Sequence, residues 1–279
     1  MLNSTVLEVS IGMLFCFGSV ALVASSIYEA IASILKLRAA SLLAGVKSML
    51  NDPKFSDLAM KVYNHAMVNP RDGGVATPGD PPAMKPSYIE PRAFAVALIE
   101  SVGGISTTFD QLKGKIDDIK NAQIHDLLAG MYARADKSLE KLHAQVAAWF
   151  DAGMGRVSGG YKRQAQLVTF LIALAVAALL NIDSFHLFST LWRHPEIAAK
   201  LPTGAAANNA WQNLDSLPIG WPQGLFASVT TIGVFGWLIT ATSALFGAPF
   251  WFDRLQRLVN IRGAGTKPAE KPADKPTAA

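Results

Sequence analysis

The tripeptide Trp-Phe-Asp occurs twice, and its residue types come nearest to catalytic chemistry in this chain. One copy is Trp149-Phe150-Asp151 and the other is Trp251-Phe252-Asp253. If the two carboxylates met at a membrane surface, they would form an acid and base pair. The alternative is structural: the tryptophans anchor helices at the membrane interface, and Asp253 caps a helix or pairs with Arg257. We favour the structural interpretation of both copies.

Four glycines follow the first copy closely: Gly153, Gly155, Gly159 and Gly160. Each costs a helix about 1 kcal/mol relative to alanine, so their number needs a reason. Either Gly155 and Gly159 permit close helix packing, or the segment unwinds into a hinge. A bend is also needed to bring Asp151 near Asp253, since helix rise places Asp151 about 20 Å before the membrane. A nucleotide-binding loop is excluded, because the sequence lacks the Gly-Lys-Ser or Gly-Lys-Thr ending and a preceding strand.

Other chemistry-bearing residues are isolated. Glu29 follows the first apolar run by one residue. It would be a proton or ion site if the helix sat deeper, but at the interface it is solvated, which we favour. The 5 histidines form no His-x-x-x-His or His-x-x-Glu zinc grouping, and no nucleophile elbow or Cys/His constellation is found. We therefore predict no enzyme activity, no cofactor and no metal.

Basic residues gather beside the apolar runs, where cations meet anionic lipid headgroups. We predict this role for five of them: Arg156, Lys162, Arg163, Arg254 and Arg257. The net charge of +4 does not indicate nucleic acid, because the basic residues are scattered among acids. The expected partners are the lipid bilayer and either a second copy of the chain or another membrane protein.

Three apolar runs predict transmembrane helices, in a chain of 279 residues of which 51% are hydrophobic and 16% charged. The expected segments are 1–36, 164–182 and 225–247, each with a run long enough to cross a bilayer core. The N-terminus lacks lysine and arginine, so we expect an uncleaved anchor. The single cysteine, Cys16, excludes an intrachain disulfide. Small residues suited to close helix contact line the first and third runs: Gly18, Ala21 and Ser25, and then Gly236, Thr240, Ser243 and Gly247.

Between the first two spans, apolar residues at three- and four-residue steps predict a helical cytosolic domain over residues 37–163. A loop rich in proline interrupts it at 69–91, and Pro91 is expected to open the next helix. Thr108 and Gln111 match a capping box, so another helix should start there. The last helix of the domain begins as a soluble helix and becomes the second span.

The segments after the second span differ in character. Residues 183–224 predict an external loop with short helical potential at its start. Ala248 and Pro249 allow a fresh helix after the third span, and residues 248–262 predict an amphipathic helix in the membrane interface. The tail, 263–279, is rich in lysine and proline and is expected to be disordered.

The distribution of positive charge predicts the orientation. Of the 25 lysines and arginines, only Arg193 and Lys200 lie between the second and third spans. All others fall on one side of the membrane, which the positive-inside rule identifies as cytoplasmic. We therefore expect the N-terminus outside and the C-terminus in the cytoplasm.

Several short motifs complete the description: GAPFWFD (247–253), LVN (258–260), RGAG (262–265), VSG (157–159), YKR (161–163) and LPIGW (217–221). Together they resemble a family of uncharacterised bacterial multi-pass inner-membrane proteins, over most of the chain. That family often has Trp where this chain has Gly160 and Leu where it has Arg254, so both segments are somewhat altered here. The resemblance implies an inner-membrane location and no activity.

These patterns predict an all-α protein with three transmembrane helices and a helical cytosolic domain between the first and second. The favoured role is a membrane-anchored interaction or scaffold protein. The alternative is an oligomeric channel or pore-forming effector gated by the cytosolic domain, because three spans without central charges cannot line an aqueous path in a monomer. A membrane enzyme using Asp151 and Asp253 is the least favoured hypothesis.

Overall fold

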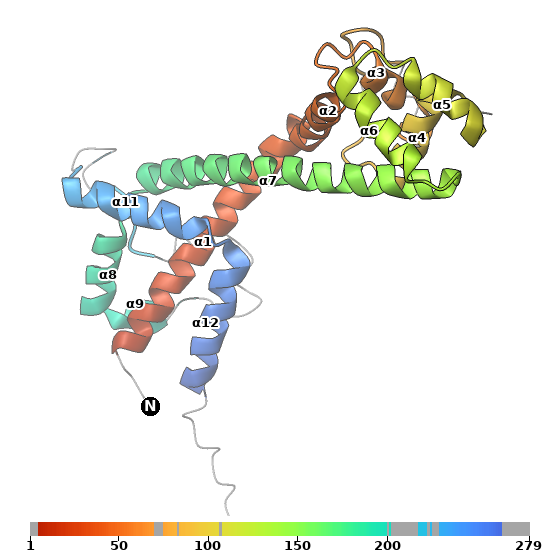
Figure 1. Cartoon of the computed structure of the whole chain (residues 1–279). Helices are drawn as coiled ribbons and strands as arrows, with labels where there is room; N and C mark the ends of the chain where they lie inside the picture. The colour runs from red at the N-terminus through yellow and green to blue at the C-terminus, as the bar shows by residue number, and fades with distance from the viewer. Residues whose placement is uncertain are drawn as a thin grey trace, which may run out of the picture. The chain divides into compact units, whose positions relative to one another are not determined.

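The computed structural model describes residues 5–69, 75–82, 84–105, 108–199, 201, 217–221, 224 and 229–263. In these ranges the chain forms eleven helices and no strand, which confirms the predicted all-α class (Figure 1). The helices are α1 (Thr5–Ile34), α2 (Leu37–Met49), α3 (Leu58–Tyr63), α4 (Pro91–Gly103), α5 (Phe109–Asp117), α6 (Ala122–Ala133), α7 (Leu139–Leu179), α8 (Ser184–Arg193), α9 (Pro195–Ala199), α11 (Thr231–Ala244) and α12 (Ala248–Gly263). The expected disordered tail lies outside the described residues, apart from Gly263.

The chain divides into two compact units. The inserted unit is Ala32–Gln164, and the split unit combines Met1–Ile31 with Ala165–Ala279. Two helices, α1 and α7, are long and apolar enough to cross a membrane. The bent pair α11 and α12 counts as a third candidate span if it is one broken segment.

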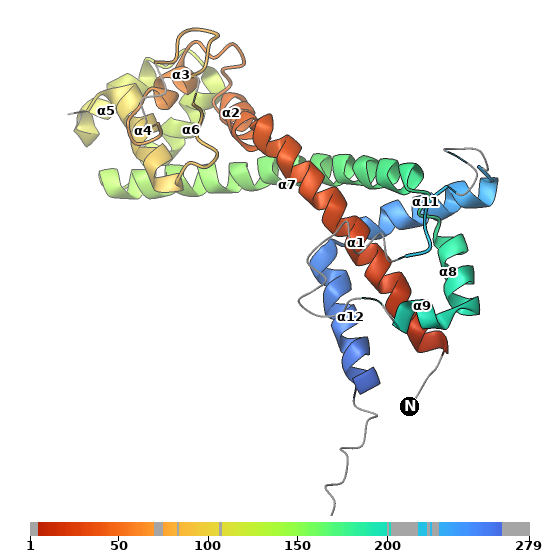
Figure 2. The same cartoon turned by 180° about the vertical axis from the view of Figure 1, so that it is seen from behind.

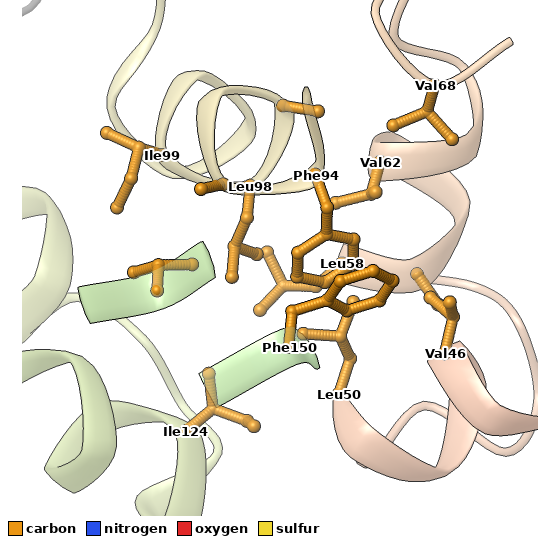
Figure 3. Packing of buried hydrophobic residues seen from close by; sticks show 14 of the residues in the cluster. Val46, Leu50, Leu58, Val62, Val68, Phe94, Leu98, Ile99, Ile124 and Phe150 are labelled. Atoms are coloured by element: carbon orange, nitrogen blue, oxygen red, sulfur yellow. The ribbon is translucent and has the colours of Figure 1, made fainter. Parts of the chain in front are cut away.

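The inserted unit has a hydrophobic core of its own, formed by α2 to α6 and the first part of α7. Figure 1 shows α3 to α6 gathered along that part of α7. The ring of Phe94 from α4 stacks on Phe150 from α7, with centroids 3.9 Å apart and both rings buried (Figure 3). Aliphatic side chains surround the two rings: Val46, Leu50, Leu58, Val62, Leu98, Ile99 and Ile124. Each such burial contributes about 1.5–3 kcal/mol, so this core can hold the unit together.

Local signals predicted several helix ends in the inserted unit correctly. Pro91 is the first residue of α4, and the Glu90 carboxylate before it accepts from the Ala93 N–H at 2.7 Å. In the predicted capping box, Gln111 accepts from the Thr108 N–H at 3.1 Å, and α5 begins directly afterwards. Such caps satisfy N–H groups that the first turn of a helix leaves unpaired.

Two polar side chains organise the connections on either side of α3. The buried carboxylate of Asp52 accepts from the N–H groups of Ser56 and Asp57 at 2.9 Å and from Ala59 at 3.2 Å. After the helix, the Asn64 amide donates to the Ala76 carbonyl at 2.9 Å and accepts from its N–H at 2.7 Å. These two hydrogen bonds resemble the backbone pairing between two β-strands. They fasten part of the proline-rich 69–91 loop to the end of α3.

In the split unit, α1 lies between α8 and α12 in both views (Figures 1 and 2). Glycines of α1 allow α8 and α12 to pack closely against it. A Cβ added at Gly12 would overlap Leu191 of α8, and one at Gly18 would lie 3.2 Å from the Phe252 ring of α12. The predicted close helix contact of the small-residue stripe is therefore confirmed at Gly18.

The small face predicted for the third run packs against the start of α8. The Thr240 hydroxyl lies 2.7 Å from the Ser184 hydroxyl and donates to the Ile182 carbonyl at 2.8 Å. Gly236 lies beside Asp183, whose carboxylate caps α8 by accepting from the Phe185 N–H at 2.9 Å. Buried hydroxyls thus meet hydrogen-bonding partners inside an otherwise apolar contact.

The helix of the third run is shorter than the expected 225–247 segment. It begins at Thr231, because the Thr230 hydroxyl accepts from the Gly233 N–H at 3.0 Å and caps the helix there. Its 14 residues span about 21 Å, less than the roughly 30 Å of a bilayer core. Gly247, with φ +82°, then separates α11 from α12, and the two helices are bent by 95°. The prediction that a new helix begins at Ala248 is confirmed.

Candidate functional site

The first Trp-Phe-Asp copy lies in the inserted unit, on α7. Phe150 is buried in the core against Phe94, and the Trp149 ring lies 6.3 Å from the same phenylalanine. Asp151 is exposed, and it makes no hydrogen bond or ion pair within the described residues. The two aromatic residues are therefore explained by packing, whereas the carboxylate is not.

The second copy belongs to the split unit, so the two aspartates are carried by different units. The Trp251 indole donates to the Ser243 carbonyl at 2.8 Å and lies 5.2 Å from the Phe17 ring. Asp253 is exposed, and in the described chain it does not form the predicted pair with Arg257. An exposed pair of this spacing gains only about 0.3–0.5 kcal/mol, too little to hold both side chains. The neighbouring Arg254 instead packs over the Phe250 ring, 5.2 Å from its centroid.

Asp151 lines a cleft of about 410 Å³ on the inserted unit. The walls come from α2, from residues 87–91 and from α7. The polar lining residues are Arg38, Ser41, Ser87, Tyr88, Asp151, Ser158 and Tyr161, and the apolar ones include Leu42, Ile89, Phe150, Met154 and Val157. Two opposite charges, five hydroxyls and several apolar side chains therefore line one depression.

The cleft was not predicted from the sequence, although Asp151 was. Arg38 is separated from Asp151 by most of the inserted unit, and the wall at Ser87 falls in the proline-rich 69–91 loop. Such a juxtaposition depends on how α2 and α7 pack. The two helices approach each other closely at Gly45 of α2, where an added Cβ would lie 2.9 Å from Val157 of α7. No periodic pattern marks a contact of this kind.

The glycines after Asp151 lie within an unbroken helix. Residues 139–179 form α7 without interruption, so this structure contains no unwound hinge at Gly159 or Gly160. Within the described chain no helix packs closely against Gly155 or Gly159, because no described atom lies within 4 Å of a Cβ built at either position. Gly153 is the exception, since its face packs against Met49 of α2.

The remaining predicted residues lie at the surface. Glu29 is exposed on α1, as are Arg156, Lys162, Arg163 and Arg257 on their helices. Their contact with lipid headgroups stays a prediction.

A second polar cluster lies on the inserted unit away from the cleft. His65 Nδ1 accepts from the Met67 N–H at 3.2 Å, so its Nε2 donates to the Glu100 carboxylate at 2.7 Å. Burial lowers the pKa of His143 below its ordinary 6.5, against the opposing pull of Glu140 and Glu100, with a smaller lowering from Arg92. Sequence reasoning missed this cluster, because its members are far apart along the chain.

The lowered pKa of His143 predicts a pH dependence of stability. The unfolded chain takes up a proton near pH 6.5 more readily than the folded one, so stability is lost as the pH falls below about 6.5. We expect the melting temperature to fall between about pH 7.5 and 5.5. His143→Gln should reduce that fall. The matched variant His186→Gln, at an exposed position of α8, should leave it unchanged, and an equal effect of both would contradict the assignment.

Comparisons with family models, with curated proteins and with solved structures found no match to this chain. The resemblance to a bacterial inner-membrane family therefore stays a prediction.

Proposed function

We propose that the protein is a membrane-anchored interaction or scaffold protein, which holds the inserted unit at a membrane surface for partners. The observation that supports this is the pairing of a unit that has its own core with candidate spans at both of its ends. The apolar faces of α2 to α7 are buried in this core. The charged faces of the same helices are therefore the surfaces proposed to bind partners. We further propose a bacterial inner membrane, with the inserted unit and C-terminus in the cytoplasm.

Binding, in preference to catalysis, is supported by the state of the two aspartates. A catalytic carboxylate is normally held by neighbours that orient it and shift its pKa. Asp151 and Asp253 are both exposed, and neither has a hydrogen-bonding partner in the described chain.

The test is gentle extraction of the full chain from its own membrane, followed by measurement of its mass with everything that stays bound. We expect a distinct protein to copurify. Alanine substitutions on charged faces of the inserted unit should release that protein while the chain stays in the membrane. A chain that carries no other protein under several mild extraction conditions would contradict the scaffold role.

Reporter fusions test the proposed orientation. A fusion near Asn208, in the 183–224 loop, is expected to report the outside, and a fusion after Ala279 the cytoplasm. A cytoplasmic signal at Asn208 would overturn the orientation.

A second candidate function is an oligomeric channel or pore-forming effector gated by the inserted unit. The 95° break between α11 and α12 favours it, because broken or re-entrant helices occur where backbone is buried in protein or lines a water-filled cavity. The same mass measurement distinguishes the two roles. A homo-oligomer without other proteins would favour the channel and justify ion-flux assays, whereas a bare monomer would eliminate it.

A further inference from the structure

We propose that α8 is embedded in the membrane beside α1, with the aromatic side chains of Phe185, Phe188 and Trp192 packed against the acyl chains of the bilayer. The sequence predicts an external loop over residues 183–224, so this inference assigns the start of that segment to the membrane. It rests on the membrane location of the candidate spans, and it goes beyond the scaffold role.

The residues of α8 form an apolar arc and a polar arc around the helix. At about 100° per residue, the apolar side chains fall on adjoining positions: Leu187, Leu191, Phe188, Trp192 and Phe185. Ser184 lies among them, and its hydroxyl is paired with the hydroxyl of Thr240. The other positions are polar: His186, Ser189, Thr190 and Arg193. A helix divided in this way is typical of those that lie in a membrane with their polar side toward headgroups and water.

The rest of the split unit covers only part of the apolar arc. Leu187 and Leu191 are 1% and 0% exposed, whereas Phe185, Phe188 and Trp192 are 48%, 47% and 50% exposed. The rings of Phe188 and Trp192 stack with centroids 5.7 Å apart, so they form a continuous aromatic surface. Contiguous apolar surface of this kind is unfavourable in water and marks a site of interaction. Tryptophan in particular concentrates at membrane interfaces.

The contact with α1 indicates what surrounds this surface. In both views α8 lies beside α1 (Figures 1 and 2), and a Cβ added at Gly12 of α1 would overlap the Leu191 side chain. Gly12 belongs to the charge-free run from Val9 to Tyr28, about one helical turn inside its start. That run spans about 30 Å, the thickness of a hydrocarbon core. When α1 crosses the bilayer, the part of α8 that touches Gly12 therefore lies at the level of acyl chains.

The neighbouring helix α11 favours the bilayer over a second protein as the occupant. Its side chains Ile232, Phe235 and Ile239 have the same spacing as the α8 aromatics and are 65%, 59% and 43% exposed. α11 belongs to the third candidate span and packs against α8. A bilayer covers the apolar faces of both helices at once, whereas a protein partner would have to match each of them. The 10 residues of α8 span about 15 Å, too short to cross the core, so the proposed orientation is unchanged.

The experiment measures which medium surrounds α8 in the full chain reconstituted into phospholipid vesicles. Cys16 is the only cysteine and is buried, so Cys16→Ala provides the background for single spin labels. The labelled variants are Phe188→Cys on the exposed apolar arc and His186→Cys on the polar arc. Collisions with oxygen, which concentrates in hydrocarbon, are compared with collisions with a water-soluble nickel chelate. We expect oxygen to dominate at position 188 and the chelate at position 186, so that the ratio of the two accessibilities reverses.

Two results at position 188 would overturn the proposal. A ratio equal to that at position 186 would place α8 in water, and protection from both reagents would show that a protein covers the aromatic face. Leu171→Cys, at an exposed position of α7, separates these failures from a failure of the membrane location. Lipid access at position 171 with water access at position 188 would refute only the α8 contact. Water access at both positions would refute the membrane location as well.

Tryptophan quenching tests the same contact without a label. Lipids brominated along their acyl chains quench the tryptophans that they touch, and the chain has 6 tryptophans. Trp192→Phe keeps an aromatic ring and should lower the quenched fraction of the emission, because a tryptophan that faces lipid is lost. The matched variant Trp149→Phe, at a partly buried position beside Phe94 in the inserted unit, should not lower it. A quenched fraction that Trp192→Phe leaves unchanged would contradict the contact.

Discussion

Phe150→Ala is expected to lower the unfolding free energy of the inserted unit by about 3–5 kcal/mol, the largest effect of any single substitution that we predict. Phe150 is buried, and its ring stacks on Phe94 at 3.9 Å in the centre of the core. Its loss removes the apolar transfer energy and leaves a cavity between α4 and α7. Because domain stability is typically about 5–15 kcal/mol, a loss of this size would remove a large fraction of the stability of the unit.

Hydrogen exchange of the full chain in mild detergent measures this effect. Amide protection should collapse in peptides from α4 to α6 and persist in the apolar part of α7. The control is Ile105→Ala, at a side chain that is 85% exposed, which should change stability by less than about 0.5 kcal/mol. Unchanged protection of α4 in Phe150→Ala would show that the stacked pair is not the centre of the core.

Gly236→Ala is expected to lower the unfolding free energy of the split unit by at least about 1–3 kcal/mol. A Cβ at this position would overlap the Asp183 carboxylate and lie 3.1 Å from the backbone nitrogen of Ser184. Displacing the carboxylate would also cost the cap of α8, about 1 kcal/mol. The contact between α8 and α11 should therefore open.

Thermal unfolding in one detergent, with hydrogen exchange of α8 and α11, measures the change. The same substitution at Gly159 is the matched control. No described atom lies within 4 Å of a Cβ there, and the residue is helical, so Gly159→Ala should stabilise α7 by about 1 kcal/mol. Opposite signs at the two positions are the expected result. Destabilisation of similar size at both would contradict the packing described for Gly236.

The features that the sequence predicted correctly are those with a local cause. Pro91 opens α4, the capping box at Thr108 opens α5, and Ala248 begins α12, because each signal acts within one helical turn. The long α7 follows from a stripe of apolar residues that runs into a charge-free segment. Such signals do not depend on how helices meet.

The features that were missed depend on residues distant in sequence. The Asn64 pairing with Ala76 and the His65 contact with Glu100 join residues with no shared periodicity. The cleft was missed for the same reason, since α2 and α7 supply Arg38 and Asp151 from opposite ends of the inserted unit. For the third span, the prediction followed hydropathy and missed the Thr230 cap, which makes α11 begin at Thr231, later than composition suggests.

The unequal burial of the two long candidate spans has a consequence for bilayer thickness. In the most apolar stretch of α1, 61% of the residues are buried inside the protein, compared with 17% in α7. The neighbours of α1 at Gly12 and Gly18 shield it, whereas side chains such as Leu167 and Leu171 on α7 are exposed. Hydrophobic mismatch costs fractions of a kcal/mol per Å at surfaces that touch acyl chains. A thinner or thicker membrane should therefore act on the tilt of α7 and leave α1 largely unaffected.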